Sequence, residues 1–179
     1  MAEPAWVDIA SDEEEPDWMI LGRQFRECRA KLILHVPRWL SYTPLHELDW
    51  QKIKYRSDDL PPKVRGVYAF VLDVVSASTT NRFPPMSTVL YVGETGDESK
   101  ETLRSRLQNY RNIKAQMNRP KVYSMLYHWG DHLDFYYAEV STGTSTKAFE
   151  TALLDALLPP KNKKDFSAIV RKARDYAFD

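Results

Sequence analysis

Two runs of β-forming residues, each bordered by a glycine, most constrain the fold of this chain. The run 66–75 begins at Gly66 and is almost wholly apolar, as expected of a strand covered on both faces. The run 89–92 precedes Gly93 and predicts a second strand. Between them, the segment 76–87 contains two consecutive prolines and predicts a turn or long loop. The second strand can therefore return beside the first.

Periodic patterns predict helices and further strands in the rest of the chain. Helical spacing of apolar residues occurs at 18–34, 99–117 and 145–158, and β-prone runs occur at 122–129 and 133–140. The two β-prone runs are joined through Gly130-Asp131, which predicts a hairpin. The predicted fold class is α+β, with a small central antiparallel sheet flanked by helices and an N-terminal helical extension.

Charge divides the chain unevenly, although the formal net charge is zero. Residues 1–17 contain seven acids and no Lys or Arg, so residues 18–179 hold 25 basic and 18 acidic residues. We interpret 1–17 as an acidic flexible arm, 18–62 as a helical or irregular extension packed on the core, and 63–179 as the main domain. A basic body suits a polyanionic partner and equally fits a protein that touches no nucleic acid.

The compartment is predicted from what the sequence contains and lacks. One cysteine, Cys28, forms no intramolecular disulfide and no thiolate zinc site. The first thirty residues lack an export-signal pattern, and no run approaches the roughly 18 apolar residues of a membrane span. We therefore expect a cytoplasmic protein that does not enter a membrane.

Two tyrosines and an arginine are candidates for a phosphate site. Tyr68 and Tyr91 each lie close to a glycine of a predicted strand, where a ligand or another backbone often approaches. Arg106 precedes Tyr110 by one helical turn, and a guanidinium matches the geometry of phosphate oxygens. The alternatives are tyrosines that only pack and an arginine on the solvated helix surface.

Glu150 is the candidate metal ligand. It lies on or beside the inward face of its helix, where an unpaired carboxylate is costly and a bound divalent cation would relieve the charge. No basic residue is expected one turn further inward. The alternative is that Glu150 turns to solvent in the first helical turn, where negative charge is favourable.

Basic residues on and after the predicted helix 99–117 are candidates for contacts to a nucleic-acid backbone. They are Arg104, Arg111, Lys114, Arg119 and Lys121. The alternative is an ordinary solvated helix end.

Five features in order give the chain a resemblance to the GIY-YIG nucleases over about residues 65–165. Gly66-Val67-Tyr68 and Tyr91-Val92-Gly93 match the two triplets, and the run 103–107 matches the arginine motif. Glu150 and Asn162 match the metal-binding glutamate and the downstream asparagine of that family.

The resemblance implies a three-stranded antiparallel sheet and one Mg²⁺ or Mn²⁺ ion held by Glu150. It implies that Tyr68 acts as the general base or orients the attacking water, and that Arg106 binds the scissile phosphate. Tyr91 would hydrogen-bond within the site, and Asn162 would support the metal-site geometry. A sixth residue, Tyr110, stands where many members have histidine and would fill that role.

The function implied is metal-dependent hydrolysis of DNA phosphodiester bonds by a compact endonuclease, similar to the restriction or mobile-element branches. The domain at 63–179 would be the nuclease, with specificity supplied by a homodimer or a partner protein. Glu94 follows the second triplet where some members have lysine, and the loop over 93–103 is longer than usual. The alternative is a module that keeps the fold, has lost catalysis and binds nucleic acid or protein.

Overall fold

The computed structural model describes residues 36–41, 46–73, 87–97 and 100–178. The predicted arm at 1–17, the predicted helix at 18–34 and nearly all of the predicted loop at 76–87 lie outside the described residues.

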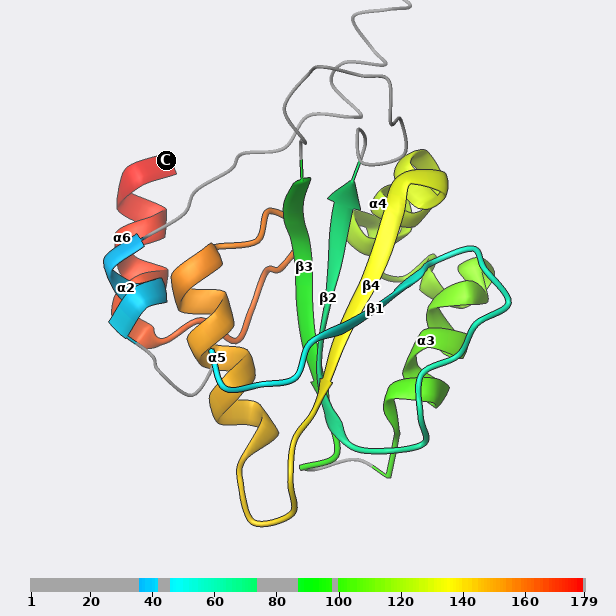
Figure 1. Ribbon diagram of the computed structural model, residues 1–179. Helices are drawn as coiled ribbons and strands as arrows, with labels where there is room; N and C mark the ends of the chain where they lie inside the picture. Colours follow the sequence, from blue (N-terminus) through cyan, green and yellow to red (C-terminus); the bar gives the residue numbers. More distant parts are fainter. Residues whose placement is uncertain (1–35, 42–45, 74–86, 98–99, 179) are drawn as a thin grey trace, which may run out of the picture.

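A four-stranded antiparallel sheet forms the centre of the molecule (Figure 1). Its strands are β1 (Gln51–Lys54), β2 (Gly66–Asp73), β3 (Ser87–Thr95) and β4 (Leu133–Glu139), in the order β1-β4-β2-β3. Helices flank the sheet, which confirms the predicted α+β class. The resemblance implied three strands, whereas β1 adds a fourth at the edge beside β4.

Helices cover both faces of the sheet (Figure 1). One side carries α3 (Leu103–Arg111) and α4 (Pro120–Trp129), with short 3-10 segments at Ile113–Gln116 and Gly130–His132. The other side carries α2 (Val36–Ser41), α5 (Thr146–Leu157) and α6 (Ala168–Phe178). Within the described ranges, no helix has the length and apolarity needed to cross a bilayer.

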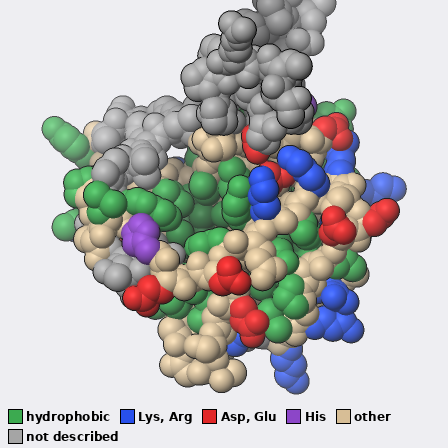
Figure 2. Space-filling view, viewed as in Figure 1, with side chains coloured by type: hydrophobic (Ala, Val, Ile, Leu, Met, Phe, Trp, Pro, Cys, Tyr) green, Lys and Arg blue, Asp and Glu red, His purple; other side chains and the backbone are tan. Residues whose placement is uncertain are grey.

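Alternation along β2 divides the core into two layers. Tyr68 and Phe70 pack with the apolar residues of α3 and α4, whereas Val67 and Ala69 pack with those of α5. The second layer includes partly buried aromatic residues such as Trp50. Figure 2 shows hydrophobic side chains gathered in a hollow near the centre of the face that is in view.

The two motif glycines are explained by close packing within the sheet. A Cβ atom on Gly66 would lie 2.1 Å from the carbonyl oxygen of Ala138 on β4. Gly93 lies opposite Tyr68 in the β2–β3 register, and a Cβ there would lie 2.3 Å from the Tyr68 hydroxyl oxygen. Both positions therefore exclude larger residues because a neighbouring strand and a phenol ring occupy the space.

Three sequence predictions of secondary structure differ from the structure. Residues 122–129 form most of helix α4 instead of a strand, with Val122, Met125 and Leu126 buried at helical spacing. The predicted hairpin at Gly130-Asp131 is therefore absent, and a 3-10 turn leads directly into β4. The helix predicted over 99–117 ends at Arg111, and Met117 is 67% exposed instead of lying on the buried face.

Candidate functional site

Three phenols and two guanidinium groups form a cluster on the α3 side of the sheet. We call this the phenol cluster: Tyr68, Tyr91, Tyr110, Arg106 and Arg119. The Tyr68 and Tyr110 hydroxyl oxygens are 2.9 Å apart. Arg119 donates from Nη2 to the Tyr91 hydroxyl at 2.8 Å and from Nη1 to the Tyr110 hydroxyl at 3.4 Å. The fold thus brings the two triplet tyrosines and the tyrosine of α3 together.

Arg106 lies near the three phenols and has part of its donor capacity unused. Its Nη2 forms an ion pair of 2.7 Å with Oε2 of Glu101. Its Nε is buried and has no hydrogen-bond partner among the described residues. Burial lowers the guanidinium pKa, but the neighbouring Tyr68 and Tyr110 outweigh burial and raise it. Arg106 is therefore a permanent cation with a buried donor that an added acceptor can satisfy.

The phenols of Tyr68 and Tyr91 are protonated at neutral pH. Burial, and next the neighbouring Tyr110, raises the pKa of Tyr68 well above its ordinary value of 10. The same two causes raise the pKa of Tyr91, although Arg119 opposes them. Tyr68 is 2% exposed, so its hydroxyl is also shielded from bulk water. This environment favours the orienting role of Tyr68 over the general-base role.

Asn162 closes the edge of β3. Its side chain accepts a hydrogen bond from the Val92 amide at 2.9 Å and donates one to the Val92 carbonyl at 2.8 Å. The Lys161 amide donates to the Leu90 carbonyl at 3.0 Å. The segment around Asn162 thus pairs with β3 as a short strand would, and gives this residue a structural role next to Tyr91.

Glu150 is buried and ion-paired. It is 6% exposed, and its Oε2 lies 2.6 Å from Nζ of Lys147. The alternative in which Glu150 turns to solvent is wrong, because the side chain is buried. The expectation that no basic residue neutralises it is also wrong, because Lys147 lies three positions earlier. The Lys147 ammonium also pairs with Asp165 at 3.0 Å. Helical spacing alone was sufficient to identify this lysine.

Excess negative charge surrounds Glu150. Burial is the largest cause that raises its pKa, and the carboxylates of Asp165 and Glu94 raise it further against the opposing effect of Lys147. Glu94 is oriented toward α5, where it accepts a hydrogen bond from Thr146 at 2.7 Å. The acid after the second triplet therefore lies on the α5 side of β3, away from the phenol cluster.

The two halves of the predicted site lie on different sides of the sheet. Arg106 and the phenols belong to the α3 layer, whereas Glu150 belongs to α5 on the other face. No hydrogen bond or ion pair links Glu150 to the phenol cluster within the described ranges. The two sides meet at the β3 edge, because Tyr91 and Asp165 line the same pocket and Asp165 is paired with Lys147.

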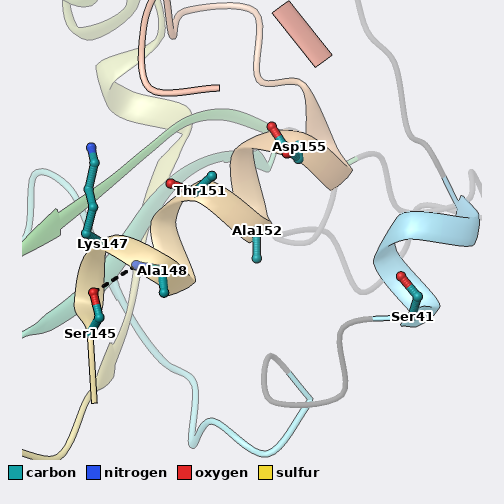
Figure 3. Close-up of a pocket in the computed structure, with 7 residues that line it drawn as sticks. All are labelled: Ser41, Ser145, Lys147, Ala148, Thr151, Ala152 and Asp155. Atoms are coloured by element: carbon teal, nitrogen blue, oxygen red, sulfur yellow. Dashed lines mark hydrogen bonds between the residues drawn. The ribbon is translucent and has the colours of Figure 1, made fainter. Parts of the chain in front are cut away.

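That pocket, here called the edge pocket, has a volume of about 350 Å³. It is lined by Tyr91, by residues 118–122 at the start of α4, and by residues 161–165 after α5. A second cavity of about 500 Å³ lies between α2 and α5. Figure 3 shows small side chains on this part of α5, with the Lys147 side chain extending away from α2. Asp155, which also lines this second cavity, accepts a hydrogen bond from the Ser167 amide.

Glu150 offers a Mg²⁺ ion one carboxylate, which Lys147 already neutralises. In the part of the chain that the structure describes, no group of three or more His, Cys, Asp or Glu side chains is arranged to hold a metal ion. Mg²⁺, however, usually binds through one or two carboxylates, water and substrate phosphates. The negative charge around Glu150 suits a cation, provided that Lys147 moves aside.

The basic residues predicted to bind nucleic acid have different surroundings. Arg104 donates to the Pro61 carbonyl, and Arg111 donates to the Tyr55 and Asp59 carbonyls, so both tie the segment before β2 to α3. Lys114 is exposed on the 3-10 segment after α3. The remaining two, Arg119 and Lys121, line the edge pocket.

Comparisons of the chain with family models, curated proteins and solved structures find no match.

Proposed function

We propose that this chain is a GIY-YIG-type endonuclease that hydrolyses DNA phosphodiester bonds with Mg²⁺ or Mn²⁺. The observation that carries the proposal is the surroundings of the Arg106 side chain. Its guanidinium lies near three phenols, and its buried Nε lacks a hydrogen-bond partner among the described residues. A phosphate oxygen supplies the missing acceptor, and its negative charge competes with that of Glu101 for the guanidinium.

The residues of the cluster would divide the work between binding and orientation. Arg106 holds the scissile phosphate and opposes the negative charge that grows in the transition state. The protonated phenols of Tyr68 and Tyr91 donate hydrogen bonds that orient water or phosphate oxygens. A divalent ion held by Glu150 would lower the pKa of the attacking water and offset phosphate charge.

Cleavage of supercoiled plasmid DNA with Mg²⁺ tests this function. We expect the natural protein to nick the plasmid, and both Arg106→Lys and Glu150→Gln to lose about 10²-fold or more in rate. Arg171→Lys, an exposed substitution on α6, is the matched control and retains the natural rate. Failure of the natural protein to cleave, or equal cleavage by all four proteins, contradicts the proposal.

The second candidate is a binding module of the same fold without catalysis. The ion pair between Lys147 and Glu150 favours it, because an internal ammonium already neutralises the carboxylate. DNA binding without cleavage under any tested divalent ion supports this candidate over the nuclease.

A further inference from the structure

We propose that the edge pocket binds the phosphodiester backbone of the nucleic-acid strand beside the phosphate held at Arg106. The inference rests on the proposed function and names how its substrate is held. Of the predicted catalytic residues, only Tyr91 and Asn162 line this pocket.

Positive charge dominates the lining of the edge pocket. Two segments distant in sequence contribute five basic residues and a single acid, Asp165, whose carboxylate is already paired with Lys147. The basic residues are Arg119, Lys121, Lys161, Lys163 and Lys164. A hollow lined in this way attracts a polyanion, and phosphate is the group that lysine and arginine bind most readily together.

The lysine charges are close enough to affect one another. Burial is the largest cause that lowers the pKa of Lys121, and Arg174 and Lys163 lower it further. Arg174 comes from α6 and donates to the Asn162 carbonyl at 3.3 Å, so a third element places a cation near Lys121. The start of α4, the segment 161–165 and α6 therefore place cations close enough to repel one another. A bound anion would relieve this repulsion.

The start of α4 adds a favourable backbone field. Pro120 occupies the first helical turn, and the N-cap residue Arg119 makes no side-chain capping hydrogen bond. Lys121 and Val122 in this first turn line the pocket. The positive end of the helix dipole therefore lies beside the same hollow as the lysines.

Arg119 connects the edge pocket to the phenol cluster. It lines the pocket while donating to the Tyr91 and Tyr110 hydroxyls, and Tyr91 belongs to both places. A strand with one phosphate at Arg106 can therefore continue past Tyr91 into the pocket without leaving basic surface.

Binding in EDTA tests the pocket without cleavage. A labelled DNA duplex and an RNA duplex of the same sequence are titrated with protein at several salt concentrations. The pocket variant combines Lys121→Gln with Lys163→Gln and so loses two charges of the pocket lining. The control variant combines Lys63→Gln with Lys172→Gln and loses two exposed charges outside the pocket. All four positions are exposed, and thermal unfolding of each variant checks that the fold is retained.

We expect the pocket variant to bind more weakly than the control variant. Its plot of log affinity against log salt should lose about 0.9 in slope for each phosphate contact removed. Equal affinity and slope in the two variants overturn the proposal, as does failure of the natural protein to bind either duplex. Preferential binding of one duplex identifies whether the backbone is that of DNA or RNA.

The outcome also separates this inference from the proposed function. Salt-dependent binding that is lost in the pocket variant, with no cleavage in Mg²⁺, supports the pocket and contradicts the nuclease. Cleavage that is lost in Arg106→Lys, with equal binding by the pocket and control variants, supports the nuclease and contradicts the pocket.

Discussion

Tyr68 shows how one buried residue constrains the chemistry. The sheet places its ring against Gly93, where only a hydrogen atom leaves room, and its hydroxyl against that of Tyr110. Packing therefore accounts for both the glycine and the tyrosine of the two motifs. The same burial keeps the phenol protonated, so a phenolate at neutral pH is disfavoured.

Replacement of this hydroxyl separates an orienting role from a proton-accepting role. We expect Tyr68→Phe to lose about 1 kcal/mol of unfolding free energy, because one buried hydrogen bond is removed, and to keep cleavage within about tenfold of the natural rate. Tyr127→Phe, on an exposed position of α4, is the control. Denaturant unfolding and single-turnover cleavage measure the two effects. A loss of about 10²–10⁴-fold in rate would instead identify Tyr68 as the general base.

Lys147 is the residue-level finding that the sequence interpretation missed. An inward-facing carboxylate was correctly identified at Glu150, and burial of that side chain is confirmed. The cation that satisfies it lies three positions earlier, at a spacing typical of helical ion pairs. Any divalent ion at Glu150 must compete with this ammonium.

Helix α5 begins at a set of contacts that ties it to the loop after β3. The Asp97 carboxylate accepts hydrogen bonds from the Ser145 hydroxyl and from the Thr146 and Lys147 amides, and pairs with Arg65. The Ser145 hydroxyl bond and the Lys147 amide bond are the two largest causes that lower the pKa of Asp97. These contacts fix the helix turn that carries Lys147 and precedes Glu150.

The lowered pKa of Asp97 predicts a pH dependence of stability. Since the folded pKa lies below the unfolded value of about 3.9, the stabilisation is present above the unfolded pKa and is lost as the pH falls toward the folded pKa. We expect Asp97→Asn to be less stable than the natural protein at about pH 7, and the difference to shrink at about pH 3. Urea unfolding at both pH values measures this, and a difference independent of pH contradicts it.

Elements with strong local signals were predicted well from the sequence. The apolar runs predicted β2 and β3, and the helical periodicity over 145–158 predicted α5, whose N-cap is Ser145. The residues of α4 include Val122 and Tyr123, which favour strands, but tertiary packing of the Val122–Met125–Leu126 face prevails. Pro120 at the first helical position was the available signal for a helix.

Contacts between distant segments were beyond prediction from the sequence. The four residues of β1 contain one apolar side chain, Ile53, so nothing local distinguishes them from a loop until β4 supplies the partner strand. Likewise, no spacing rule relates Arg119 to Tyr91, or Asn162 to Val92. These contacts depend on how the segments after α3 and α5 converge on the edge strand.

For the whole molecule, the central question is whether the two faces of the sheet act at one site. The phenol cluster and Glu150 are carried by different layers, and the β3 edge is where residues of both layers border a common pocket. A single shared site requires that a metal ion at Glu150 and a phosphate at Arg106 meet around this edge.

Paramagnetic broadening by Mn²⁺ measures that proximity most directly, because the effect falls steeply with distance from the ion. With ¹³C-labelled tyrosine, we expect Mn²⁺ to broaden the Tyr91 signal more than that of the exposed Tyr176 on α6, and Glu150→Gln to abolish the effect. A Tyr91 signal that Mn²⁺ leaves sharp, or broadens equally in Glu150→Gln, would contradict a single site shared by the phenols, Arg106 and Glu150.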